Sequence, residues 1–409
     1  MTAEHPELIT SPRGAVSLVT DQATLLALIA RIDPGAPVAF DAERAQSFRY
    51  SSRAYLIQMR QSGCGTHLLD PIALAGGAPM ADLHELSDAL AGCEWVLHAA
   101  SQDLPCLAEV GLVPQHLFDT ELAGRLLDLP KVSLSPMLTQ YLGIELAKAH
   151  SADDWSRRPI PDSSLDYASL DVDYLLELHD AVAADLDTTG KMAWAREEFA
   201  DALHRFAIVP EPDADRWRQT KGLGHLRNPR QLAVARSLWQ TRDTLARHLD
   251  ISPGRLLSDH QLTDAAVNLS PLRPGQVVAQ LALTDGFGGR FARRHRQLWV
   301  DAIESALKLK PSLLPPATHG HETPPPRFWA QQNAAAAKRW ELARPAVVAV
   351  AEQHQLPTEN LMTVATLASL VWHDDATYSE SGLRDAMTKA QVRQWQQDLL
   401  APVLADVLG

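Results

Sequence analysis

The sequence PVAFDAE, residues 37–43, is an apolar run that ends in two carboxylates one residue apart. The run predicts a buried strand, and because strand side chains alternate between faces, Asp41 and Glu43 point the same way. Two like charges this close, at the mouth of an apolar sheet, are costly unless a cation lies between them. Two solvated acids at a strand end are the alternative interpretation, and acids further along the chain decide between the two.

The segments around this strand predict a mixed sheet. Residues 16–20 favour a short strand, and Asp21 is a suitable N-cap for the helical run ATLLALIARI. The alternation in AYLIQMRQ and the run THLLD, separated by Ser-Gly-Cys-Gly, predict a hairpin. Helical and strand patterns then alternate, with helices expected at 80–90 and 101–110 and strands at 95–100 and 116–118. This order indicates an α/β sheet covered by helices.

Two later segments supply more acids. Asp103 follows the predicted strand in EWVLHAASQD, at the first turn of the next helix. It could be a helix N-terminal charge stabilised by the dipole, or a site residue at the carboxyl edge of the sheet, where α/β sites gather. In the helical pattern at 163–186, Tyr167 and Asp171 are four residues apart and share a face. Asp119, at the start of another helix, is interpreted as a cap.

Four acids and a phenol from three elements predict a particular chemistry. Carboxylates that converge without His or Cys ligands form an oxygen-only site suited to Mg²⁺ or Mn²⁺. Such a site can hold two divalent cations and drive the attack of water on a phosphodiester, with the phenol orienting the water by a hydrogen bond. We therefore expect a hydrolase that acts on nucleic acid.

The charge is segregated along the chain. The whole sequence carries 50 Asp plus Glu against 37 Lys plus Arg, which argues against a nucleic-acid binder. Residues 215–310 reverse this, with 16 Lys plus Arg against 8 Asp plus Glu. Within that segment Lys221, Arg227 and Arg230 flank a Gly-Leu-Gly turn, and we expect them to contact phosphates, although a solvated charged face is the plainer alternative.

The remaining composition points to the cytoplasm. The three cysteines have neither CxxC spacing nor a disulfide framework, which fits a reducing compartment. The N-terminus MTAEHPELITSPRG lacks the basic and apolar regions of a signal peptide, and no stretch approaches 18 apolar residues. We expect a soluble cytoplasmic protein.

The strings FDAE, LHAASQD and YASLD, in this order, resemble the three signature motifs of the DEDD superfamily of 3′ to 5′ exonucleases, in its tyrosine branch. The whole chain resembles the bacterial ribonuclease D family. The resemblance implies an α/β exonuclease domain with a ribonuclease H-like fold, followed by two all-α domains of the helicase-and-RNase-D C-terminal (HRDC) type. Each motif is short, but the ordered set is specific.

Carried over to this chain, the resemblance assigns the metal-binding acids as Asp41, Glu43, Asp103 and Asp171. Asp41 would bridge the two ions, and Tyr167 would orient the nucleophilic water.

The residue after the first motif departs from the family pattern. Many relatives carry Thr or an apolar residue where this chain has Arg44, which would alter contacts to the terminal nucleotide without removing a ligand. Phe48 could stack on the last base, or be an ordinary packed loop aromatic. In DWSRRPIP, which is similar to a Trp-x-x-Arg-Pro stretch of the family, Arg157 and Arg158 could meet phosphates or stack on the Trp.

The second half contains a weak internal repeat. Two helical stretches each carry a Trp in a long helix, Trp239 and Trp340, and later a Pro-x-x-x-Leu turn into the next helix. A Pro-rich segment separates them and predicts a stiff linker. We expect four regions, namely an exonuclease domain (1–208), a first HRDC domain (209–310), a linker (311–326) and a second HRDC-like domain (327–409).

The expected activity is metal-dependent 3′ to 5′ exoribonuclease action that trims RNA 3′ ends, tRNA precursors being the usual substrates of the family. RNA preference and polarity follow from the resemblance. Two alternatives stay open, a DNA 3′ to 5′ exonuclease and a nucleic-acid-binding adaptor with an inactive centre. The presence of all five site positions argues against the adaptor. We expect a monomer, because an internal pair of helical domains can encircle a substrate without a partner.

Overall fold

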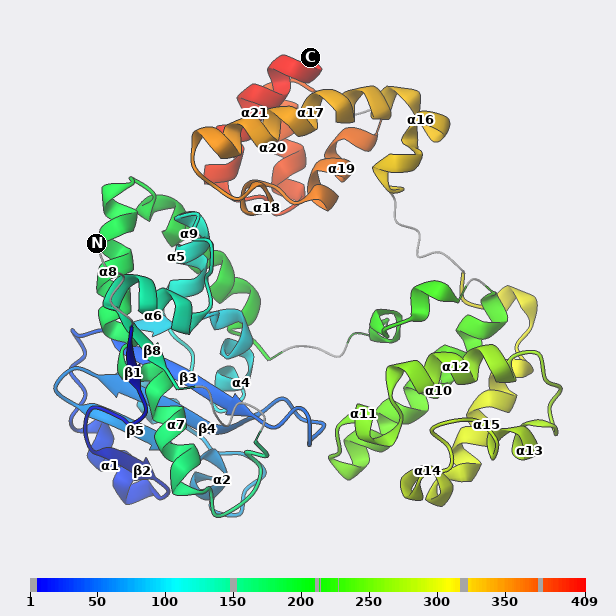
Figure 1. The fold of residues 1–409 in the computed structure, drawn as a ribbon, viewed down its shortest axis with the longest axis horizontal. Helices are drawn as coiled ribbons and strands as arrows, with labels where there is room; N and C mark the ends of the chain where they lie inside the picture. The colour runs from blue at the N-terminus through cyan, green and yellow to red at the C-terminus, as the bar shows by residue number, and fades with distance from the viewer. Residues whose placement is uncertain are drawn as a thin grey trace.

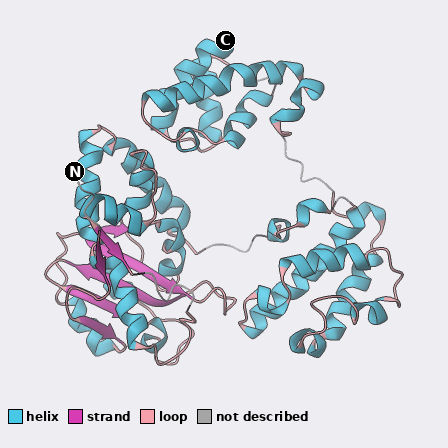
Figure 2. Cartoon of the chain, viewed as in Figure 1, coloured by secondary structure: helices cyan, strands magenta, loops and turns pink. Residues whose placement is uncertain are grey.

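The structure, a computed structural model, describes residues 6–147, 153–209, 213, 215–226, 228–316, 323–373 and 378–409. Its N-terminal domain, which comprises β1 to α9, is built on a six-stranded mixed sheet flanked by helices (Figures 1 and 2). In spatial order the strands are β2 (Val16–Val19), β5 (Gly65–Leu69), β4 (Ala54–Gln61), β3 (Val38–Arg44), β6 (Glu94–Leu97) and β7 (His116–Asp119).

The direction of the strands follows the predicted plan. The pairs β3–β4 and β4–β5 are antiparallel, which confirms the hairpin, whereas β2–β5, β3–β6 and β6–β7 are parallel. A second, two-stranded parallel sheet, which the sequence pattern did not predict, joins β1 (Glu7–Ile9) to β8 (Ile144–Leu146). Apolar side chains of β3 face the main core, where the rings of Phe40 and Trp95 stack with centroids 4.2 Å apart.

The helices of this domain connect and cover the strands. They are α1 (Gln22–Ile29), α2 (Pro71–Leu74), α3 (His84–Ala89), η1 (Ala100–Gln102), α4 (Leu104–Ala108), α5 (Thr120–Leu126), α6 (Leu134–Leu142), α7 (Asp162–Asp173), α8 (Leu175–Thr188) and α9 (Met192–Phe206). The single helix expected at 163–186 is wrong, because the chain breaks at Tyr174 (φ −118°, ψ 7°). The break lets α7 lie across β3, β4 and β5 while α8 packs mainly against α5 and α6 and also contacts β6 and β3.

The first helical domain has a core of its own. Its helices are η2 (Arg216–Gln219), η3 (Leu223–His225), α10 (Pro229–Leu249), α11 (Pro253–Leu256), α12 (Asp259–Leu269), α13 (Val277–Leu281), α14 (Arg290–Arg294), α15 (Arg296–Leu307) and η4 (Pro311–Leu313). The expected linker at 311–326 begins with η4, and its residues 317–322 lie outside the described part of the chain.

The C-terminal helical domain repeats this plan. Its helices are η5 (Pro326–Phe328), α16 (Trp329–Gln332), α17 (Ala334–Gln353), α18 (Thr358–Leu361), α19 (Val364–Trp372), α20 (Glu380–Lys389) and α21 (Gln394–Leu408). In both domains a long helix is followed by a four-residue helix that starts at or just after a proline, as the repeat predicts. A buried tryptophan, Trp217 or Trp329, precedes each long helix.

The C-terminal domain is joined to the N-terminal domain through α9. The indoles of Trp194 and Trp395 stack with centroids 5.0 Å apart. Glu198 accepts hydrogen bonds from the Arg393 guanidinium at 2.7 and 3.1 Å and from Trp395 Nε1 at 2.9 Å. A paired, largely buried contact of this kind holds the two domains in one orientation.

In the described part of the chain, none of the helices has the length and apolar character needed to cross a membrane. The three cysteines are buried and free, as their spacing predicted.

Candidate metal centre

The carboxyl end of β3 presents the first two acids. Asp41 and Glu43 are half-buried and lie on the sheet face that α7 covers. The register between β3 and β4 shifts after Glu43, because Glu43 pairs with Leu56 while Arg44 pairs with Ala54. The extra residue on β4 forms a bulge, a feature that bends a strand and re-aims side chains at a sheet edge.

The helix α7 brings the third acid across the sheet. Asp171 lies one turn beyond Tyr167 on that helix, as the spacing predicts. Carboxylate oxygens of Asp41, Glu43 and Asp171 all lie within 4.8 Å of one another. The two acids that share a face of β3 and the acid on α7 thus lie together, and three of the four predicted acids form a compact cluster.

Asp103 reaches the same edge of the sheet from β6, the parallel neighbour of β3. The turn after β6 is unusual, since Ala99 has a left-handed backbone (φ 60°, ψ 51°). Asp119 holds this turn, accepting hydrogen bonds from the backbone N–H groups of Ala99 at 3.0 Å and Ala100 at 2.8 Å. The same carboxylate caps α5, which confirms the predicted capping role.

The structure gives Asp103 a partner that the sequence did not suggest. Its carboxylate lies 3.4 Å from the Arg44 guanidinium, which also donates a hydrogen bond to the carbonyl of Gln102. Asp103 is not one of the three acids whose oxygens lie within 4.8 Å of one another. It also makes no capping hydrogen bond to α4. Arg44, the departure from the family pattern, lies inside the acidic centre.

The pKa values of the four acids are raised, as expected for buried carboxylates that lie close together. Burial raises the pKa of Asp41, Asp103 and Asp171, and the charge of Asp41 raises the latter two further. Burial, followed by the charges of Asp41, Asp171 and Asp103, raises the pKa of Glu43 to about 9. The charge of Arg44 lowers the pKa of Asp41, Glu43 and Asp103 but does not offset burial. A set of oxygen donors held together at such a cost fits divalent cations.

Tyr167 lies in the field of this cluster. Burial, then the charges of Asp171, Glu43 and Asp41, raise the pKa of the Tyr167 phenol to about 12. The phenol is therefore protonated at neutral pH and can donate a hydrogen bond. That is the state a residue needs if it orients a water molecule without removing its proton.

Beside Glu43 lies a polar cavity of about 200 Å³ whose walls include Arg44, Ser47, Phe48 and Asp153. One face of the Phe48 ring is covered by the Arg255 guanidinium of the first helical domain, 4.2 Å from the ring centroid. Arg255 also donates from Nε to the Ser47 carbonyl at 2.7 Å. No local pattern marks Arg255, because it lies 208 positions from Ser47, the loop residue whose carbonyl it binds.

The arginines predicted near the family's Trp-x-x-Arg-Pro stretch divide into two cases. Arg158 is committed to the protein, donating to both carboxylate oxygens of Asp70 at 2.7 Å and to the carbonyls of Tyr55 and Trp155. Arg157 is exposed and pairs with Asp154 at 3.3 Å. Only Arg157 of the two retains donors that solvent or a phosphate can reach.

The predicted phosphate-contacting group of the first helical domain divides in the same way. Lys221 is exposed. One Arg230 nitrogen donates to the carbonyls of Ala306 and Leu309, both at 2.8 Å, at the end of α15. Arg227 lies outside the described residues. The half-buried Arg230 is therefore a structural residue that ties α10 to α15.

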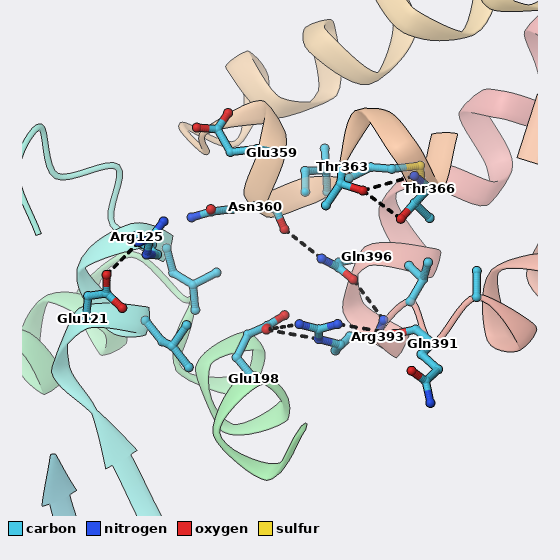
Figure 3. A pocket seen from close by; sticks show the side chains of 16 residues that line it. Glu121, Arg125, Glu198, Glu359, Asn360, Thr363, Thr366, Gln391, Arg393 and Gln396 are labelled. Carbon is cyan, nitrogen blue, oxygen red and sulfur yellow. Dashed lines mark hydrogen bonds and ion pairs between the residues drawn. The ribbon is translucent and has the colours of Figure 1, made fainter. Parts of the chain in front are cut away.

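A larger cavity lies at the contact of two domains. It has a volume of about 360 Å³ and opens between the N-terminal domain and the C-terminal helical domain, with Arg125 and Glu198 on one side and Asn360 and Gln396 on the other. Figure 3 shows two ion pairs among its charged groups, Arg393 with Glu198 and Arg125 with Glu121, while Glu359 has no dashed line to another residue drawn. None of the four acids lines it, so we treat it as part of a domain interface.

Three protein families match separate parts of the chain. A family described as "3'-5' exonuclease" matches residues 16–187. The HRDC domain family matches residues 231–303, and a family described as "3' to 5' exonuclease C-terminal domain" matches residues 322–408. These matches follow the order of the three domains in the structure.

Curated relatives and solved structures cover most of the chain. Ribonuclease D of Zymomonas mobilis is 30% identical over 307 residues, which cover 73% of this chain and 74% of the relative. Ribonuclease D of Jannaschia is 29% identical over 313 residues, or 74% and 78% of the two chains.

A crystal structure of a protein from Bifidobacterium adolescentis superposes with a TM-score of 0.84 at 32% identity and covers 98% of this chain and 99% of its own. The crystal structure of Escherichia coli RNase D, an exoribonuclease involved in structured RNA processing, gives a TM-score of 0.68 at 24% identity, with 97% and 99% covered. The similarity extends over all three domains.

Proposed function

Because the chain belongs to the ribonuclease D family of 3′–5′ exoribonucleases, we propose that it shortens RNA by hydrolysing the last phosphodiester at a free 3′ end and releasing a nucleoside monophosphate. The observation that carries this proposal is the cluster of Asp41, Glu43 and Asp171, whose carboxylate oxygens lie within 4.8 Å of one another. Asp103, on the neighbouring strand, completes the four acids.

In this proposal Asp41, Glu43, Asp103 and Asp171 would hold two divalent cations, Mg²⁺ or Mn²⁺, with Asp41 as a ligand of both. When bound, such cations would supply the activation of a water molecule and the stabilisation of negative charge on the leaving oxygen. The protonated Tyr167 donates a hydrogen bond that orients the water. Arg44, paired with Asp103, offers a fixed positive charge next to the position of the scissile phosphate.

The substrate reaches the acids beside the β3–β4 loop, residues 45–53. The polar cavity between Glu43 and Phe48 adjoins the acids and is a suitable size for part of one nucleotide. We propose that the face of Phe48 opposite Arg255 stacks on a base and that Arg157 and Lys221 contact phosphates further along the strand. Arg158 leaves this group, since its Nε, Nη1 and Nη2 all donate inside the protein. Arg230 stays in it through the nitrogens that do not donate to the carbonyls of Ala306 and Leu309.

The proposal extends to the substrate and the assembly. RNA with a free 3′ end is the expected partner, with tRNA precursors as the substrates that the family resemblance implies. The separate core of residues 217–306 supports a first HRDC domain at 209–310 between an exonuclease domain (1–208) and a C-terminal domain (327–409). Each helical domain contacts the exonuclease domain within one chain, which supports action as a monomer.

The test is digestion of 3′-labelled single-stranded RNA, and of its DNA counterpart, in Mg²⁺, Mn²⁺ or EDTA. We expect metal-dependent release of labelled mononucleotide from RNA, and we expect Asp41→Asn or Asp171→Asn to lower the rate about 10³-fold or more. Asp166→Asn, an exposed acid on the same helix as Asp171, is the matched control and should keep the wild-type rate. Binding of RNA without release in every metal would contradict the proposal and favour the adaptor. Preferential digestion of DNA would favour the DNA exonuclease.

A further inference from the structure

Gln58 lies beside the acidic cluster, in the middle of β4, and its side chain is 0% exposed. In the antiparallel pair of β3 and β4 it lies directly opposite Asp41. Directly opposed residues in such a pair point to the same face, with Cβ atoms about 4.5–5.5 Å apart. The Gln58 amide is therefore on the Asp41 side of the sheet, beneath α7.

The amide of Gln58 has no hydrogen-bond partner among the described residues, at either Nε2 or Oε1. Of the residues around it on this face, Leu56, Leu68 and Ala168 are apolar, and neither Asp41 nor Arg60 forms a hydrogen bond with it. A buried amide without partners lowers the stability of a fold, and such groups are rare in native proteins. The position therefore has a cost that packing does not explain.

The same strand contains a second buried glutamine that is satisfied. Gln61 accepts a hydrogen bond from Asp33 N–H at 2.9 Å and donates to the carbonyls of Asp33 at 2.8 Å and Ala36 at 3.2 Å. Gln61 is also buried, at 1% exposed. A buried glutamine with a structural role can thus have all its polar groups hydrogen-bonded in this fold. Gln58 differs from Gln61 because its amide has no such partners.

We propose that Gln58 is a positioning residue for Asp41, and that its amide takes up its hydrogen bonds when the centre holds cations. Carboxylates that bind metals are themselves held by hydrogen bonds from neighbouring groups, and loss of such a group weakens metal binding. Nε2 of Gln58 is a donor placed next to Asp41, on a strand that cannot slide without disrupting the sheet. The inference rests on the proposed function of the acids as a metal centre.

The test uses Gln58→Met, which keeps the size of the side chain and removes both polar groups. Calorimetric titration with Mn²⁺ should show affinity reduced about 10- to 100-fold. The melting temperature in EDTA should stay equal or rise, because an unpaired buried amide is removed. The matched control is Gln61→Met, which should lower the melting temperature in EDTA and leave Mn²⁺ affinity unchanged. Gln58→Leu serves as a second variant, with the same expectation, if Met is not tolerated.

The outcomes separate this inference from the proposed function. Unchanged Mn²⁺ affinity in both Gln58 variants would overturn the inference. If these variants also melted as low as Gln61→Met, Gln58 would have a structural role only. If the wild type hydrolyses RNA while the Gln58 variants bind Mn²⁺ normally, only the role of Gln58 falls. If the wild type neither binds Mn²⁺ nor hydrolyses RNA, both fall.

Discussion

Single residues explain why the acidic centre is held at a cost to stability. Glu43 has an ordinary pKa of 4.5, and burial with three acidic neighbours raises it to about 9. Between those values the folded protein without cations keeps a proton that the unfolded chain has released. The contribution of Glu43 to the stability of the folded protein is therefore fully present below pH 4.5 and is lost as the pH rises towards 9. Cation binding removes this penalty, since the charged form is then paired.

A pH series tests this at Glu43. In EDTA, Glu43→Gln should melt at about the wild-type temperature near pH 5 and increasingly above it towards pH 8, by about 2–4 °C for each kcal/mol of penalty removed. Differential scanning fluorimetry at four pH values is the measurement. With Mn²⁺ present the order should reverse, because the variant loses a ligand. Glu352→Gln, an exposed position on α17, is the control. A constant difference at every pH would contradict the argument.

At the scale of elements, the β3–β4 loop joins the acidic centre to the first helical domain. Asp250, at the end of α10, accepts hydrogen bonds from the backbone of Tyr50 and Ser51. The backbone N–H of Ser252 donates to the Phe48 carbonyl at 3.1 Å, and Arg255 covers the Phe48 ring. The loop that starts next to Glu43 is thus held by a separate domain, so that domain influences how Phe48 meets a nucleotide.

Removal of one of these contacts should loosen the loop. We expect Arg255→Ala to increase amide hydrogen exchange in residues 45–51 and to raise KM for RNA about 10-fold, with little change in kcat. A residue that positions the substrate, and takes no part in the chemistry, has this signature. Arg273→Ala, an exposed arginine of the same domain, removes the same charge and is the control. Unchanged exchange in the loop would show that Arg255 does not hold it.

At the scale of the molecule, three of the 16 Lys and Arg residues in 215–310 lie together on one short helix, α14. Arg290, Arg293 and Arg294 of α14 are exposed, and none of them has an ion-pair partner among the residues described. Phe291, beside them, is 43% exposed. Unpaired guanidinium groups with an exposed aromatic side chain are typical of a surface that binds single-stranded nucleic acid. Three other arginines of this domain, Arg218, Arg242 and Arg247, each pair with an acid.

Replacement of the three arginines by alanine should weaken binding of long RNA. We expect about 10-fold or more lower affinity and a slope of log affinity against log salt that is shallower by about 2–3. Hydrolysis of a dinucleotide should not change, since no residue of α14 lines the cavity beside the acids. The control replaces three arginines that each pair with an acid on their own helix, Arg125, Arg205 and Arg384. Equal losses on long and short substrates would contradict a role in binding.

Local features of this protein were predictable from sequence. Strand alternation placed Asp41 and Glu43 on one face, and the four-residue spacing placed Tyr167 with Asp171, because both rules depend only on backbone geometry. The hairpin, the mixed sheet and the repeated helical plan followed from period and turn residues. The break at Tyr174 and the sheet of β1 and β8 were missed, since packing decided them and no local signal marks either.

Side-chain partners were decided by the tertiary structure. Arg158 was predicted to meet phosphate, yet it pairs with Asp70, 88 positions away. Arg230 binds carbonyls at the end of α15, and Arg44 lies against Asp103. A sequence states which groups a chain carries and how neighbours along it are oriented. The packing of the elements decides which distant groups are buried together. It therefore decides which charges are paired, and that the Gln58 amide of β4 lies beside the acidic cluster.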